Sequence, residues 1–375
     1  KPRRQGRLRR RVAGMRLDGA ALIRRTSRQG VEGWVWAKGS NYHPLVGHSE
    51  CQTSSCCWPI DPMSVYRAIW DLGDTMATRI HEFHGYAPLS PMSRELAGRH
   101  WCPFVDAKCK KKFGACSLSN LEGATVMICP NRLYADSFTV LDDIADRAFG
   151  LGHSLLSRTE AKRRKVAGQL SGKEIAVFGQ GFDGEISIPA PKEPGANRSG
   201  RFKIDFVLAR LTSEGEIADF AAVEVQTIDT TSSYKDAGEK LMAGEPYVNS
   251  RGGDTTKAGF NWENVTKRIL PQIIYKGHTL RREPLCTKGL FFILPQAVYE
   301  RIKVRIGGDL LEHPVGSGTV TFVTYELSDE SAQPTPLRKV ETFTTTVDQI
   351  AYAFVSPRNL PGAGSYASAI DAALL

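Results

Sequence analysis

Residues 201–228 read RFKIDFVLARLTSEGEIADFAAVEVQTI. In its first half every second residue is apolar, which is the period of a β-strand with one buried face. Asp205 falls on the opposite face of that strand. In its second half apolar residues again alternate, and Glu224 and Gln226 fall on the face opposite to them. Eighteen residues separate Asp205 from Glu224, enough for a turn between paired strands, so the sequence predicts that Asp205, Glu224 and Gln226 meet at one point.

Two carboxylates that meet in this way suit a hard divalent cation. Mg²⁺ is usually held by one or two carboxylates, with waters and a substrate phosphate as its other ligands. Such an ion polarises a phosphate and lowers the pKa of a bound water. Glu185, in the strand-like run GEISI, is a candidate third acid of this site. The alternative is that these side chains are polar residues of a strand face that meets solvent.

The rest of the chain alternates between strand-like and helix-like runs. Strands are predicted at 174–179, 184–188, 201–211, 219–228, 289–294, 319–327 and 339–347. Helices are predicted at 78–85, 139–149, 157–166, 261–277 and after residue 347, with Pro271 as a first-turn residue or a kink. Strands interleaved with helices predict an α/β or α+β fold with a mixed central sheet flanked by helices.

The net charge of +9 is unevenly distributed over the 375 residues. Residues 1–62 contain twelve Lys or Arg against four Asp or Glu, so the remainder of the chain is close to neutral. The same segment shows no sustained helical or strand period. We therefore interpret residues 1–75 as an extension that is disordered or does not belong to the natural protein, whose translation would then start further along. No apolar run approaches the roughly 18 residues of a membrane span, and we expect a cytoplasmic protein.

The eight cysteines of a chain without an export signal indicate metal binding or catalysis before disulfides. Four of them lie within 28 residues, at Cys102, Cys109, Cys116 and Cys129. The surrounding residues 99–132 are rich in Gly, Pro and Lys, which favours loops held by a metal ion rather than by a large core. Four thiols favour a tetrahedral site for zinc or iron, although unligated cysteines that happen to cluster remain the alternative. Three further cysteines, Cys51, Cys56 and Cys57, are a weaker candidate for a second site.

Residues 157–166 predict a helix with a basic face. Candidate contacts to DNA phosphates are Arg158, Lys162, Arg163 and Lys165 on this helix, together with Lys235 in the run SYKDA. A basic helix face that simply meets solvent would look the same in the sequence.

The order of several short motifs resembles the NotI/EagI-type type II restriction endonucleases. These motifs are CPF at 102–104, CPNRL at 129–133, GEISI at 184–188, FKIDFVLA at 202–209, EVQTID at 224–229, SYKDA at 233–237, NVTKRILPQIIYK at 264–276 and GLFFILPQAVYERI at 289–302. The resemblance covers about residues 76–357. It implies a PD-(D/E)XK restriction-endonuclease-like core with Asp205, Glu224 and Gln226 as catalytic residues and Glu185 close by. It further implies a structural Cys₄ site that binds iron rather than zinc, for which Cys109 matches least well in spacing.

Most PD-(D/E)XK nucleases have a lysine at the position of Gln226. The family that the chain resembles differs from them in having glutamine there, and this chain shares that glutamine. A neutral amide can orient the attacking water but cannot lower its pKa by charge, so more of the activation falls to the metal. The resemblance divides the chain into the extension 1–75, a Cys₄ module at 76–138, a nuclease domain at 139–357 and a flexible tail at 358–375.

The function that follows is a Mg²⁺-dependent, site-specific endonuclease acting on double-stranded DNA at a GC-rich palindrome. A twofold-symmetric site favours a homodimer with one active centre per strand, and a cognate DNA methyltransferase encoded nearby is expected. Two alternatives remain open from the sequence. One is a repair or processing nuclease with an iron–sulfur or zinc site, and the other is a non-enzymatic DNA-binding protein stabilised by a metal.

Overall fold

A computed structural model describes two parts of the chain. In the N-terminal unit, which ends at Tyr66, three strands pair antiparallel in the order β1 (Arg16–Leu17), β2 (Ala20–Thr26) and β3 (Glu32–Ala37). The sequence had predicted no regular structure there. In the second unit the structure describes residues 77–189, 201–328, 331–356 and 362–374. The candidate second cysteine site, Cys51, Cys56 and Cys57, lies outside the described residues.

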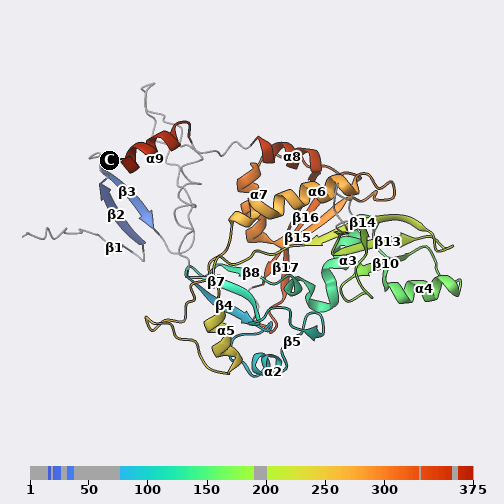
Figure 1. Ribbon diagram of the computed structural model, residues 1–375, viewed down its shortest axis with the longest axis horizontal. Coiled ribbons are helices and arrows are strands. Elements are labelled where there is room, and N and C mark those ends of the chain that lie inside the picture. Colours follow the sequence, from blue (N-terminus) through green and yellow to red (C-terminus); the bar gives the residue numbers. More distant parts are fainter. Residues whose placement is uncertain are drawn as a thin grey trace, which may run out of the picture. The chain divides into compact units, whose positions relative to one another are not determined.

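A seven-stranded mixed sheet forms the centre of the second unit, in the order β17-β16-β15-β14-β13-β10-β9 (Figure 1). Its strands are β9 (Ser154–Ser157), β10 (Glu174–Gly179), β13 (Phe206–Leu211), β14 (Ile217–Val225), β15 (Leu290–Pro295), β16 (Thr319–Leu327) and β17 (Leu337–Thr346). Strands β14, β15 and β16 run parallel, as do β9 and β10, while the remaining neighbours pair antiparallel. The mixed sheet flanked by helices that the sequence predicted is therefore confirmed.

Both faces of this sheet are buried, because successive residues of its central strands enter different cores. Leu290 and Phe292 pack in one core, against helices α6 (Leu270–Leu280), α7 (Gln296–Ile306) and α8 (Val347–Val355). Phe291 and Ile293 pack in the other core, against α3 (Ala135–Phe149). Burial on both faces explains why GLFFIL is continuously apolar. Helix α4 (Arg158–Val166) starts directly after β9, at the Ser157 N-cap.

The cysteine-bearing segment has more regular structure than predicted. Its three-stranded sheet has the order β4-β7-β8, and β5 pairs with β6. Its elements are β4 (Thr78–Phe83), α2 (Pro91–Arg99), β5 (Trp101–Cys102), β6 (Ala107–Lys108), β7 (Ala115–Asn120), β8 (Thr125–Met127) and the 3₁₀ helix η1 (Pro130–Tyr134). The predicted helix at 78–85 is wrong, since β4 occupies these residues. The strand is favoured by tertiary pairing with β7 and by the burial of Glu82, which binds the fully buried Arg132 at 3.0 Å.

Two other predicted elements have different bounds. The single strand at 201–211 is interrupted at residues 204–205, leaving β12 (Arg201–Lys203) to pair with β11 (Ser187–Pro189) and β13 to continue in the central sheet. At 261–277 a π-turn, η2 (Val265–Ile269), leads into α6, and Pro271 lies in the first turn of α6 as predicted.

The remaining helices are α5 (Lys235–Met242) and α9 (Ser365–Leu374). Helix α9 lies in the predicted tail, and none of its described residues is buried. Among the described residues, no helix has the length and apolar character needed to cross a membrane.

Candidate active site

The hairpin of β13 and β14 brings Asp205 and Glu224 together. In the register of this hairpin Phe206, the first residue of β13, pairs with Val223 of β14. Asp205, one residue before β13, therefore lies opposite Glu224. The Val225 backbone N–H donates to Asp205 Oδ2 at 2.9 Å. As predicted, Val223 and Val225 enter the core beneath α3, which leaves Glu224 on the face covered by α6.

The break in the strand at residues 204–205 explains how Asp205 is presented. Phe202 and Ile204 pack in the core beside α6, whereas Phe206 and Leu208 pack in the core beside α3. In an unbroken strand all four would share one face. The chain therefore changes face just before Asp205, and the irregular backbone frees this carboxylate to bind the end of β14.

Both acids are poorly hydrated. Glu224 is only 7% exposed, and Asp205 is partly buried. Burial, reinforced by the negative charge of Asp205, raises the pKa of Glu224 to about 8. Burial also raises the pKa of Asp205, against the opposing effects of the Val225 N–H and of a nearby lysine. Two closely spaced carboxylates whose pKa values are both raised, mainly by burial, form a site where a bound cation removes an electrostatic cost.

That lysine is Lys276 of α6, which the sequence analysis did not single out. Its Nζ lies 2.5 Å from Glu224 Oε1, and its side chain is 18% exposed. The buried residues of α6, among them Leu270 and the fully buried Ile273, fix the helix against the sheet. The only signal in the sequence was its place at the end of NVTKRILPQIIYK.

The other two predicted site residues lie at the edge of this pair. The Gln226 side chain donates to the Thr227 carbonyl at 2.8 Å, while its backbone N–H binds the Ile293 carbonyl of β15. Glu185 is exposed and pairs with Lys203 at 3.4 Å, yet its charge contributes to the raised pKa of Asp205. Glu185 is thus near the pair without being buried with it.

The comparison with known families bears on this region. Residues 179–288 match the family model of restriction endonuclease NotI. The resemblance to NotI-type restriction endonucleases is thereby confirmed over this segment, which contains Glu185, Asp205, Glu224, Gln226 and Lys276. The cysteine-bearing segment lies outside the match. No curated protein matches the chain significantly.

The carboxylate pair fits the Mg²⁺ that a NotI-type nuclease implies, because one or two carboxylates suffice for this ion. Within the described ranges, no three Cys, His, Asp or Glu side chains are arranged so that they could hold a metal ion. A site of two acids completed by water and phosphate is compatible with that finding.

The four predicted cysteine ligands lie in one region. Cys102 and Cys116 are buried in a small apolar cluster that Cys109 borders. Burial raises the pKa of the Cys129 thiol to about 11 and raises that of Cys116 well above its ordinary value, and neighbouring thiols add to both shifts. Four sulfur donors in one region suit iron or zinc. They do not form a closed ligand shell in this structure, so the Cys₄ site stays a prediction.

A buried ion pair missed by the sequence analysis holds this region. Arg132 of the CPNRL motif is fully buried, donates to both oxygens of Glu82 at 3.0 Å and lies over the Phe104 ring at 4.8 Å. Ser117 also donates to Glu82, at 2.8 Å. Tyr134, the last residue of η1, is also buried. Burial raises the pKa of the Tyr134 hydroxyl, and the negative charge of Asp205 adds to this rise. The 3₁₀ helix η1, which contains Arg132 and ends at Tyr134, therefore extends from the cysteine region toward Asp205.

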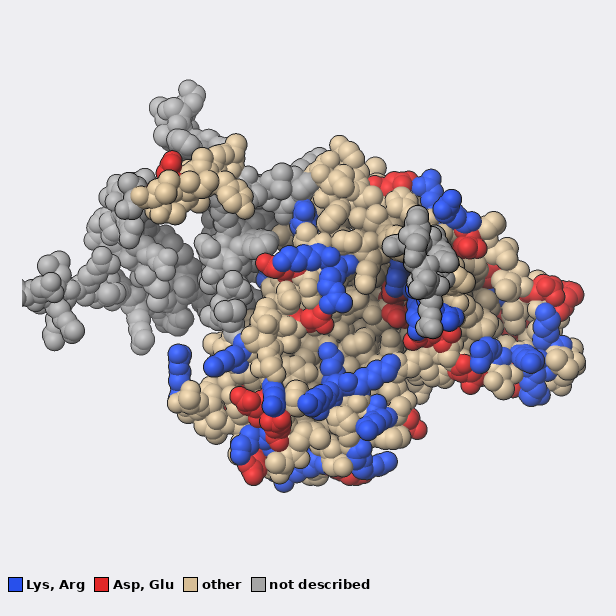
Figure 2. All heavy atoms as spheres, in the orientation of Figure 1, with Lys and Arg blue, Asp and Glu red and all other residues tan. Residues whose placement is uncertain are grey.

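The predicted DNA contacts lie outside the acid pair. Helix α4 is confirmed, and Figure 2 shows that its region carries basic and acidic side chains together. Arg163 binds Glu160 at 2.7 Å, and Lys165 binds Glu216 at 3.2 Å, so part of the basic face is already paired. Lys162 and Lys235 are exposed, and Lys235 pairs with Glu239 at 3.6 Å.

Proposed function

We propose that the protein is a type II, site-specific restriction endonuclease that hydrolyses phosphodiester bonds of double-stranded DNA with Mg²⁺. The observation that carries the proposal is the pair of the buried Glu224 and the partly buried Asp205, held by the β13–β14 hairpin inside the segment that matches the NotI family. The alternatives, a repair nuclease and a non-enzymatic DNA-binding protein, have no observation in their favour.

Asp205 and Glu224 would hold the ion, which when bound polarises the scissile phosphate and acidifies a water. The Val225 N–H fixes one oxygen of Asp205 and leaves the other oxygen available as a ligand. Gln226 would have to release the Thr227 carbonyl to orient the attacking water. Glu185 is placed to act from the rim, because it is exposed and close enough to influence Asp205.

Lys276 supplies the positive charge that Gln226 lacks. Its ammonium reaches the acids from α6 rather than from the end of β14. In the absence of the ion it stabilises the ionised form of Glu224, and with substrate bound it can donate to the phosphate that accumulates negative charge. We therefore assign Lys276 to the site as a positively charged partner of the acid pair.

The further parts of the proposal concern partners. A GC-rich palindromic site calls for a homodimer with one acid pair facing each strand. A cell that makes such an enzyme needs a cognate methyltransferase to protect its own DNA. Iron or zinc bound by Cys102, Cys109, Cys116 and Cys129 would supply folding free energy to the cysteine region rather than take part in cleavage.

The test is a digest of DNA of known sequence with Mg²⁺, followed by mapping of the fragment ends. Discrete fragments are expected from the natural protein, and neither Asp205→Ala nor Glu224→Ala should cut, although both should still bind the DNA. Asp254→Ala is the matched control, since Asp254 is an exposed carboxylate paired with Arg79 elsewhere on the surface. Undiminished cleavage by either site variant, or random degradation by all four proteins, would contradict the proposal.

A further inference from the structure

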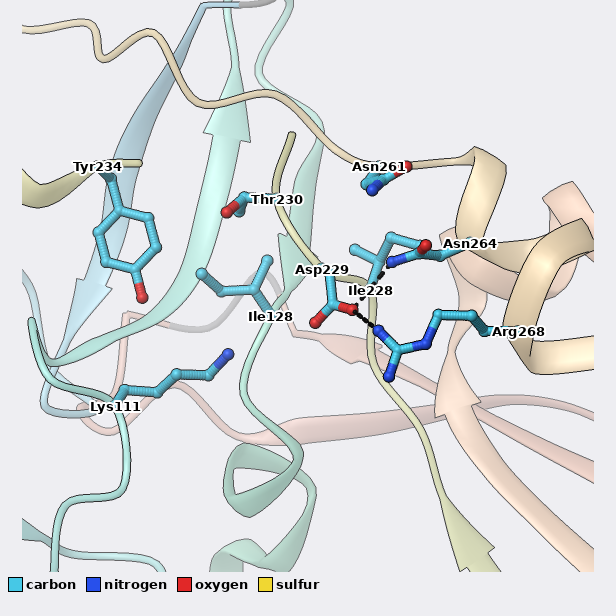
Figure 3. A pocket seen from close by; sticks show the side chains of 9 residues that line it. All are labelled: Lys111, Ile128, Ile228, Asp229, Thr230, Tyr234, Asn261, Asn264 and Arg268. Atoms are coloured by element: carbon cyan, nitrogen blue, oxygen red, sulfur yellow. Dashed lines mark hydrogen bonds and ion pairs between the residues drawn. The ribbon is translucent and has the colours of Figure 1, made fainter. Parts of the chain in front are cut away.

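A pocket of about 420 Å³ lies where the cysteine region meets the segment that leaves the acid pair. Figure 3 shows Lys111 entering it from the cysteine-bearing loop, Asp229 and Thr230 from the chain after β14, and Asn264 and Arg268 from the start of the helical segment that becomes α6. A volume of this size falls within the range of sites that hold small ligands, roughly 300–1,000 Å³.

Backbone contacts connect the elements that line the pocket, which lies close to the acids. The Asp229 carbonyl accepts from the Asn261 backbone N–H at 2.8 Å, and Thr230 bridges to Phe260. Asp229 is three residues beyond Gln226, so it lies at most about 11 Å away from it. DNA carries one phosphate per strand for about every 3.4 Å of helix axis. A strand cut at the acid pair can therefore place a neighbouring phosphate in this pocket.

The charge of the pocket is positive. Asp229 Oδ2 is occupied, because Arg268 pairs with it at 3.0 Å and the Asn264 amide donates to it at 2.9 Å. Lys111 is partly buried, and in the part of the chain that the structure describes no carboxylate pairs with its ammonium, which points into the pocket (Figure 3). The Lys111 ammonium thus lies in a partly enclosed space without a paired carboxylate among the described residues, and the thiols of Cys109 and Cys129 are close enough to interact with it.

The other polar groups are those that bind phosphate. Thr230 and Tyr234 contribute hydroxyl groups and Asn261 an amide to the same lining as Lys111. Lys, Arg, Thr, Asn and Tyr side chains are among the groups that contact phosphates in protein–DNA complexes.

We propose that this pocket binds a backbone phosphate that flanks the scissile phosphate, with Lys111 as its principal contact. The inference rests on the proposed function, because it needs DNA lying across the acid pair. It also gives the cysteine region a part in DNA binding. Lys111 lies between Cys109 and Cys116, and its carbonyl accepts from the Cys109 thiol at 3.5 Å. The position of Lys111 is therefore coupled to that of the cysteines.

The test compares the natural protein with Lys111→Gln, Lys111→Arg and the control Lys112→Gln, whose lysine is an exposed neighbour outside the pocket. The probe is a duplex that contains the site mapped by digestion, without divalent ions. Binding by Lys111→Gln should lose about 0.9 from the log–log salt slope, the value for one phosphate contact. Lys111→Arg and Lys112→Gln should retain the natural slope.

A second measurement locates the phosphate. Single phosphates of the duplex are replaced by uncharged methylphosphonates, one position at a time. One replacement flanking the cut should weaken the natural protein and leave Lys111→Gln unaffected, because the lost contact is the same. Uniform sensitivity at every position in both proteins would overturn the inference, and so would a changed site preference with an unchanged slope.

Two controls separate the other roles of Lys111. Loss of the cysteine-bound metal in Lys111→Gln, by elemental analysis, would assign the lysine to the cysteine site and overturn the inference. Thermal stabilisation of the natural protein by inorganic phosphate, without any change in the DNA slope of Lys111→Gln, would indicate a free-anion site and overturn it as well. If the natural protein neither binds nor cuts DNA, the proposed function itself fails. If it does both and Lys111→Gln behaves identically, only the pocket inference fails.

Discussion

Replacing Lys276 by Met tests whether Lys276 on α6 supplies the catalytic positive charge that most PD-(D/E)XK nucleases have at the position of Gln226, after β14. Lys276 is the only cation that the structure pairs with Glu224 among the described residues, at 2.5 Å and with 18% of its side chain exposed. Removing one preorganised charge from a site of developing negative charge costs about 2.7–4 kcal/mol, or roughly 10²–10³-fold in kcat. Met keeps most of the length and volume, so the loss should come from charge rather than from packing.

The pH dependence has a defined sign. Lys276 lowers the pKa of Glu224, which burial and Asp205 together raise to about 8. Without the lysine this pKa rises further, so a higher pH is needed to ionise Glu224 and to bind the metal. The acid limb of the pH–rate profile for Lys276→Met should therefore move to higher pH. A metal-binding role for Glu224 also predicts that raised Mg²⁺ partly compensates.

The assay is single-turnover nicking of a plasmid, with DNA binding measured separately. Lys267→Met is the matched control, because Lys267 lies in η2 of the same helical segment and pairs with the exposed Glu263. Adding Gln226→Lys to Lys276→Met should restore part of the rate by returning a cation to the acids from β14. Rates for Lys276→Met equal to those of the control, with an unshifted pH profile, would refute the reasoning.

Three further outcomes are expected. Arg132→Met should lower the free energy of unfolding by about 3–5 kcal/mol, because it leaves Glu82 buried without its cation, and denaturant titration measures this. Cys129→Ser should lose the iron or zinc found by elemental analysis and lose stability with it, while a fully active and metal-free natural protein would end the Cys₄ proposal. If both Arg158 and Lys162 contact phosphates, replacing them by Gln should reduce the slope of log K against log salt concentration by about two. An unchanged slope would show that this face of α4 meets solvent and does not bind DNA.

The central sheet could be predicted because its buried strands appear in the sequence as continuous or alternating apolar residues. Residues 174–179 and 319–327 were predicted with the bounds of β10 and β16. Residues 78–85 were not, because Glu82 reads as a surface residue until its partner Arg132 is known, and the two lie 50 positions apart. Single-sequence periodicity contains no information on such pairing.

The acid pair could be predicted because it depends on local sequence pattern, whereas Lys276 depends on long-range packing. Glu224 lies in β14 and Asp205 directly precedes β13, so their proximity follows from the pairing of two strands that a short turn connects. Lys276 reaches them from a helix 52 residues after Glu224, and nothing in a helical period shows which cation will be buried. Likewise the break at residues 204–205 lies within an uninterrupted alternation and follows from a change of core, which only the tertiary structure reveals.

The run NVTKRILPQIIYK combines two tasks in one helical segment. Its first half places Asn264 and Arg268 at the pocket beside Asp229, and its last residue is Lys276 at the acid pair. An α-helix turns about 100° per residue, so the angle between the two groups depends on every residue between them. The π-turn η2 includes Arg268 and has one more residue per hydrogen-bonded ring than an α-helical turn. It thereby rotates Arg268 relative to an uninterrupted helix while α6 stays packed on the sheet. This explains physically why one motif of fixed length can serve both the pocket and the acid pair.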